Sequence, residues 1–132
     1  MKGLLPLLFH PAYVHFPIAF FFLETGLWIA WLLKGGEEHR RFAALAFRWG
    51  YVLMLMAMVT GFLHAGGLAG IDAKVRPHFY SALALFVFYT LRAVYSYCVK
   101  DLSRHSGYWQ TAGALTGIIL VTVTAFFGGR LV

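Results

Sequence analysis

The chain has 132 residues, of which 61% are hydrophobic and only 12% are charged. A soluble domain of this size cannot cover so much apolar surface with so few charged side chains, so the composition indicates an integral membrane protein. The net charge of +6 does not indicate a nucleic-acid partner, because the basic residues lie at the ends of apolar stretches, where they set topology and contact anionic lipid.

Four apolar stretches are each long enough to cross a bilayer, whose hydrocarbon core of about 30 Å requires roughly 20 residues of helix. They cover residues 12–33, 42–64, 78–99 and 108–127. The segments between them contain glycine and charged residues and are predicted to be loops. These segments are 34–41, 65–77 and 100–107. Because short connections favour antiparallel neighbours, we expect a single-domain, all-α, integral membrane four-helix bundle with up-down-up-down topology.

The N-terminal segment resembles a signal peptide, since Lys2 is followed by a short apolar run. The apolar residues continue past Pro17 to about Leu33 without a small-residue cleavage site. We therefore expect a retained first helix, preceded by a short segment lying at the membrane interface.

The basic residues are distributed unevenly between the two ends of the expected bundle. Near the two short loops lie Lys34, Arg40, Arg41, Arg48, Lys100 and Arg104. Near the opposite end lie Lys2, Lys74, Arg76 and Arg130. The positive-inside rule then places the short loops in the cytoplasm, with both termini and the middle loop facing outward.

The histidines are concentrated at the expected outer end. His10 and His15 open the first stretch, His64 closes the second and His78 opens the third. At 1.5 Å per residue, His15 and His78 lie level within roughly one helical turn. Imidazoles that converge from separate helices are the ligands that a bis-His haem or a metal site requires. His39 lies in a charged loop, as does His105, and both are expected to be solvated.

Other roles for the four outer histidines remain open from the residues alone. His15 and His78 are also suited to an interhelical hydrogen bond, worth around 1 kcal/mol. His64 is placed to cap the second helix, and His10 to sit at the interface. Three or four of these imidazoles are also suited to a copper or zinc site.

Polar residues and glycines inside the spans give further expectations. Glu24 is predicted to pair with Arg92 or Arg48 in a structural ion pair, the alternatives being a proton path or a quinone-binding group. Gly113 and Gly117 form a small-xxx-small pattern, which predicts close packing within the chain or, alternatively, a homodimer face.

Several segments resemble a bacterial four-helix membrane family, domain of unknown function 2231. They are His10-Pro11, Val14-His15-Phe16-Pro17-Ile18-Ala19, Thr60-Gly61-Phe62-Leu63, His78 and the closing Gly128-Gly129-Arg130-Leu131-Val132. The resemblance covers nearly the whole chain. It implies redox work, because members resemble small membrane cytochromes and occur joined to c-type haem or iron–sulfur domains.

Carried over by resemblance, His15 and His78 become the axial pair of a haem b. The chain departs from the family pattern at His64, where an acidic residue is expected, so His64 would be an extra ligand peculiar to this chain. His64 and His10 are alternate ligands, and the two together would hold a second haem beside the first. We expect an electron-transfer subunit, not a stand-alone enzyme. Its expected partners are other subunits of a membrane redox complex, a periplasmic c-type cytochrome and quinone. The alternatives are a histidine-ligated copper or zinc protein and a structural or assembly subunit without a cofactor.

Overall fold

The computed structural model describes the backbone of residues 5–100 and 103–131 and the side chains of residues 13–100 and 103–131. The described residues form the long helices α1 (Leu5–Lys34), α2 (Glu37–His64), α3 (Arg76–Cys98) and α4 (Arg104–Gly129), with a short 3₁₀ helix, η1 (Gly67–Gly70). Each of the four long helices is long and apolar enough to cross a membrane. The predicted all-α membrane bundle is confirmed.

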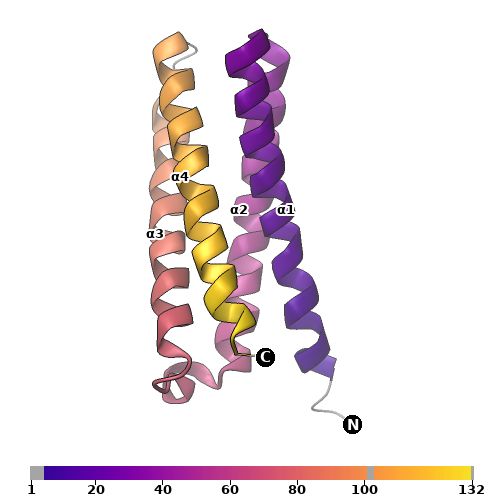
Figure 1. Cartoon of the computed structure of the whole chain (residues 1–132), viewed down its shortest axis with the longest axis vertical. Coiled ribbons are helices and arrows are strands. Elements are labelled where there is room, and N and C mark those ends of the chain that lie inside the picture. The colour runs from indigo at the N-terminus through magenta and orange to yellow at the C-terminus, as the bar shows by residue number, and fades with distance from the viewer. Residues whose placement is uncertain (1–4, 101–102, 132) are drawn as a thin grey trace.

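The four long helices run alternately up and down, as the sequence predicts (Figure 1). At one end α1 begins, α4 ends and η1 lies in the connection between α2 and α3 (Figure 1). We call this the histidine end, because His15, His64 and His78 lie toward it. The other end holds the connections at residues 35–36 and 99–103, and we call it the basic end.

The helices extend beyond the apolar stretches, so the predicted loop bounds are wrong. The connection predicted at 34–41 contains only Gly35 and Gly36, both with positive φ of 69° and 92° that glycine adopts without strain. Glu37 opens α2, and an acidic residue in the first turn is favourable at a helix N-terminus. Hydropathy marks only the apolar part of a helix, and these helices continue past it into polar and charged residues.

Two other boundaries differ for similar reasons. Residues 5–11 belong to α1, so the first helix begins before residue 12, where the apolar stretch was expected to start. The helix predicted from residue 108 begins at Arg104, because the Ser103 hydroxyl caps it by accepting a hydrogen bond from the Ser106 N–H (3.2 Å). Pro77 lies in the first turn of α3, where its missing N–H leaves no helical hydrogen bond unmade.

The core is divided between two clusters of large side chains. The first contains Phe21, Phe47, Met54, Leu85, Tyr89 and Val121. The second, nearer the basic end, contains Trp28, Trp31, Ala43 and Ala114. Beyond the first cluster, toward the histidine end, the only buried side chains among the described residues are those of Pro17, Ala57 and Thr124. Large buried side chains therefore fill the interior from the basic end to just past the middle of the bundle, and only small side chains are buried closer to the histidine end.

Candidate functional site

Three of the four candidate histidines lie on three different helices at the histidine end. His15 is exposed on α1, His64 is the exposed last residue of α2, and His78 is half-buried in the first turn of α3. His10 lies outside the residues whose side chains the structure describes. The antiparallel topology thus brings His15, His64 and His78 to one end of the bundle.

His78 is the candidate whose surroundings are best defined. Its Nδ1 lies 3.1 Å from the carbonyl oxygen of Thr124 on α4. A carbonyl oxygen only accepts hydrogen bonds, so Nδ1 carries the hydrogen and donates it. The other ring nitrogen, Nε2, is then left with its lone pair. Within the described residues Nε2 makes no hydrogen bond.

A glycine on α4 makes room for the His78 ring. A Cβ at Gly128 would lie 3.0 Å from Cε1 of His78 and 3.1 Å from Nδ1, closer than most Cβ contacts. The next residue, Gly129, has no atom within 4 Å of its own Cβ position. The hydrogen bond to Thr124 and the contact with Gly128 together fix the imidazole between α3 and α4.

The other histidines do not combine with His78 into a multi-ligand centre. No group of three or more His, Cys, Asp or Glu side chains is placed to hold a metal ion among residues 13–100 and 103–131. A copper or zinc site with three imidazoles therefore cannot be assembled from His15, His64 and His78 as they stand. This result concerns groups of three or more ligands and does not apply to a haem held by two histidines.

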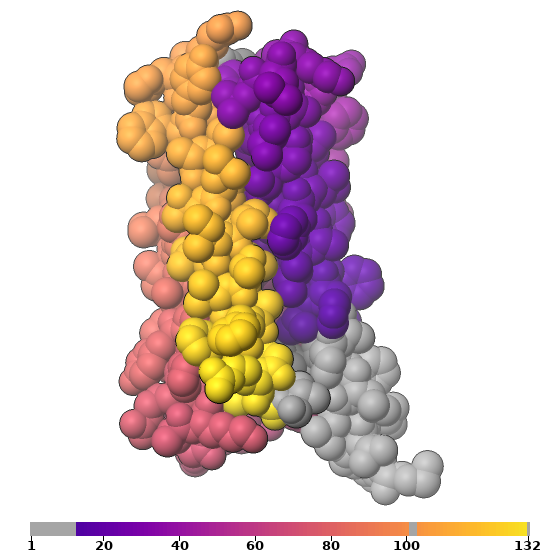
Figure 2. All heavy atoms as spheres, in the orientation of Figure 1, coloured from indigo at the N-terminus to yellow at the C-terminus, as the bar shows by residue number. Residues whose placement is uncertain are grey.

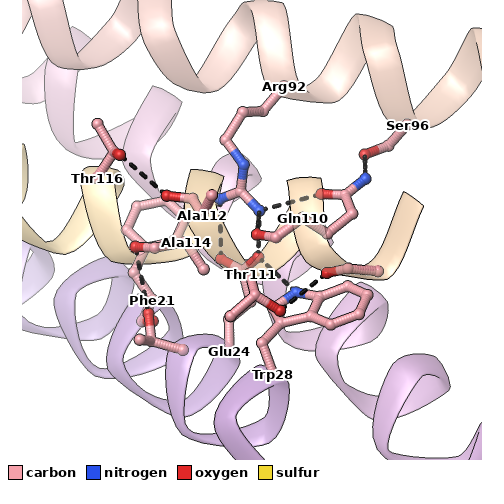
Figure 3. Close-up of polar contacts among 12 residues, drawn as sticks. Phe21, Glu24, Trp28, Arg92, Ser96, Gln110, Thr111, Ala112, Ala114 and Thr116 are labelled. Carbon is pink, nitrogen blue, oxygen red and sulfur yellow. Dashed lines mark hydrogen bonds and ion pairs between the residues drawn. The ribbon is translucent and has the colours of Figure 1, made fainter. Parts of the chain in front are cut away.

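A second polar site lies deeper in the bundle, where α3 reaches α1 (Figure 3). The Arg92 guanidinium donates to both carboxylate oxygens of Glu24, with Nη2–Oε1 at 2.6 Å and Nη1–Oε2 at 3.2 Å. The exposed fractions of these side chains are 9% and 1%. The predicted ion pair of Glu24 is thus formed with Arg92. Arg48, the other predicted partner, is exposed on α2.

Neighbouring polar groups make further hydrogen bonds to this pair. Trp28 Nε1 donates to Glu24 Oε1 (3.2 Å), and Gln110 Oε1 accepts from Arg92 Nη2 (3.2 Å). Gln110 in turn donates through Nε2 to the Ser96 hydroxyl (3.0 Å), as Figure 3 shows. Two opposite charges with paired geometry and further hydrogen bonds offset much of the cost of burial. The network ties α1, α3 and α4 together.

The glycines of α4 give this network its space. A Cβ at Gly113 would come within 2.9 Å of Nε of Arg92, and one at Gly117 within 2.3 Å of the Tyr89 hydroxyl oxygen. The small-xxx-small pattern therefore serves packing of α4 against α3 within the chain. The sequence analysis did not predict that Gln110 and Trp28 belong to the network. The available signal was the polar amide of Gln110 within an apolar span.

Comparison with known proteins gives one match. Residues 6–132 match the family described as predicted membrane protein DUF2231. No curated protein and no solved structure matches the chain. The match covers nearly the entire chain and agrees with four apolar helices. The chain therefore belongs to the DUF2231 family of predicted membrane proteins.

Proposed function

We propose that this protein is an electron-carrying membrane subunit that holds one haem b at the histidine end, with His15 and His78 as axial ligands. The observation that carries the proposal is the hydrogen bond from His78 Nδ1 to the Thr124 carbonyl oxygen. Histidines that ligate metals usually donate their second ring nitrogen to a carbonyl or carboxylate, which fixes the tautomer and the ring orientation. His78 has this arrangement with Nε2 left for a metal.

The residues that contact His78 on α4, Thr124 and Gly128, are both small. The side chains buried closest to the histidine end are also small ones, Pro17, Ala57 and Thr124. His15 supplies a second imidazole from α1, and pairs of imidazoles are established axial ligands of haem iron. Haem supplies one-electron chemistry when it is bound.

The residues of the chain would hold, orient and tune the group. The Thr124 carbonyl fixes the tautomer and the orientation of the His78 imidazole through the Nδ1 hydrogen, and Gly128 leaves room for the ring. His64 and His10 are alternate ligands in this proposal and would form a second pair only if two haems bind.

In this proposal the protein exchanges electrons with partners and does not convert a substrate. Outside the four helices the chain has little surface, which favours work within a larger membrane redox complex. By this reasoning the electron partners are a periplasmic c-type cytochrome and quinone, and the protein lies in a bacterial inner membrane with both termini in the periplasm.

The test is the visible spectrum of the detergent-purified protein, oxidised and then reduced with dithionite, together with a pyridine haemochrome assay. We expect a Soret band and a sharp reduced α-band, both lost in His15→Ala and in His78→Ala. His105→Ala, an exposed histidine at the basic end, is the matched control and should keep both bands. A folded, colourless protein from haem-replete cells would contradict the proposal.

A structural or assembly subunit is the second candidate, and the same hydrogen bond favours it. The bond from His78 to Thr124 joins α3 to α4 whether or not a cofactor binds. This alternative predicts that His78→Ala lowers stability while the wild-type spectrum shows no haem. If the protein is colourless, metal analysis separates this alternative from a copper or zinc protein. Bound copper or zinc would require a further ligand, such as His10.

A further inference from the structure

Two exposed arginines lie on the membrane-facing side of α2, close to the basic end. Arg41 and Arg48 are seven residues apart, which places them on the same side of the helix two turns apart. Both side chains are exposed. Within residues 13–100 and 103–131, Arg48 makes no hydrogen bond or ion pair.

The depth of Arg48 makes its exposure costly. It lies six residues past Phe42, about 9 Å along the helix from the start of the apolar stretch. A charged side chain at such a depth needs an anion or must extend to the interface. Side chains on a helix lean toward its N-terminus, and α2 begins at the basic end. The Cα–Cβ bond of Arg48 therefore tilts toward the turn that holds Arg41 and toward the basic end.

An apolar groove runs beside the two arginines between α1 and α2. Its volume is about 440 Å³. It is lined by Phe20, Leu23, Leu27, Phe42, Leu45, Ala46 and Trp49. Leu45, which lines the groove, is one turn from Arg41 and one turn from Arg48. The wall of the groove is therefore next to the two arginines on α2.

We propose that this region binds an anionic phospholipid, with an acyl chain in the groove and the phosphate between Arg41 and Arg48. Charge complementarity favours a lipid over a partner helix. A partner helix would have to place a carboxylate of its own in hydrocarbon, at a cost similar to that of Arg48. A phospholipid carries its phosphate at the membrane surface, where the extended Arg48 side chain and Arg41 meet it. The site is independent of the proposed haem.

The proposal is tested by native mass spectrometry of the detergent-purified full chain with equal amounts of phosphatidylglycerol and phosphatidylcholine of the same acyl chains. We expect more bound phosphatidylglycerol, and we expect Arg41→Gln/Arg48→Gln to reduce that preference by about tenfold. Arg41→Lys/Arg48→Lys should keep most of it. Lys74→Gln/Arg76→Gln removes the same charge from exposed residues at the histidine end and should leave the preference unchanged.

A groove variant separates the acyl chain from the headgroup. Leu23→Trp fills the groove from an exposed position and should reduce binding of both lipids alike. Inorganic phosphate should not displace the bound lipid. Equal binding of the two lipids by the wild type, or a preference that survives Arg41→Gln/Arg48→Gln with helical content intact by circular dichroism, would overturn the proposal. Displacement by phosphate together with an inert Leu23→Trp would overturn it in favour of a simple anion site.

Discussion

The two halves of the bundle are packed in different ways. In the basic half, large rings surround the buried Glu24–Arg92 pair, and Arg92 lies 4.7 Å from the centre of the Phe47 ring. Closest to the histidine end, the buried side chains among the described residues are small, and the half-buried imidazole of His78 contacts Gly128. Dense packing and a satisfied ion pair hold the helices together, whereas small side chains and a fixed imidazole suit a bound group. We infer that stability is concentrated in the basic half.

The largest effect is expected from removing one partner of the buried pair. Arg92→Leu leaves the Glu24 carboxylate buried without its counter-charge, which destabilises proteins by about 3–5 kcal/mol. Unfolding by sodium dodecyl sulfate, followed by circular dichroism, measures the loss. Arg76→Leu removes an exposed arginine at the start of the same helix and is the control.

The double variant distinguishes lost pairing from lost packing. Glu24→Leu/Arg92→Leu removes both charges, so it should be more stable than Arg92→Leu alone, because no unpaired charge remains. If Arg92→Leu unfolds at the same detergent concentration as the wild type, the ion pair does not stabilise the basic half. The inference that stability is concentrated there would then be wrong.

A smaller loss is expected where α4 touches Tyr89. In Gly117→Ala the new Cβ would lie 2.3 Å from the Tyr89 hydroxyl oxygen, so the ring or the helix must move. Overpacking of this kind costs about 1–3 kcal/mol. Gly26→Ala is the matched control, since nothing lies within 4 Å of its Cβ position. If both variants unfold at the same detergent concentration, α4 and Tyr89 can move apart at little cost, and the predicted overpacking is contradicted.

The sequence predicted the features that follow from hydropathy and spacing. The four spans, their alternating direction and the close packing around Gly113 and Gly117 were all accessible in this way. Pairing of Glu24 was expected, but its choice of Arg92 over Arg48 depends on how each helix is rotated about its axis. That rotation is set by packing of all four helices together.

Other features left no signal in the sequence. The acceptor for His78 is a backbone carbonyl, and every residue carries one, so Thr124 could not be singled out. The ends of the helices were placed too far inside, because hydropathy marks the hydrocarbon boundary, and Ser103 and Glu37 begin or support helix outside it.

A third variant tests the histidine half. Gly128→Ala places a Cβ 3.0 Å from the His78 ring and should shift the imidazole, whereas Gly129→Ala meets nothing. Because few buried side chains surround this site, we expect the free energy of unfolding to change by under about 1 kcal/mol. If haem binds as proposed, its reduced α-band should weaken or move in Gly128→Ala alone. A large loss of stability would show that this end is as tightly packed as the other.

The smallest effect is expected at a single hydrogen bond between α2 and α3. The hydroxyls of Tyr51 and Thr90 lie 3.0 Å apart, and both side chains are half-buried. Hydrogen bonds between membrane helices average about 0.6 kcal/mol, since the unfolded chain in the membrane also finds partners. Tyr51→Phe and Thr90→Val should each cost about this much, and the double variant should cost no more than either alone. Additive losses would mean that the two hydroxyls act separately, so that α2 and α3 are held by packing in the basic half and not by this bond.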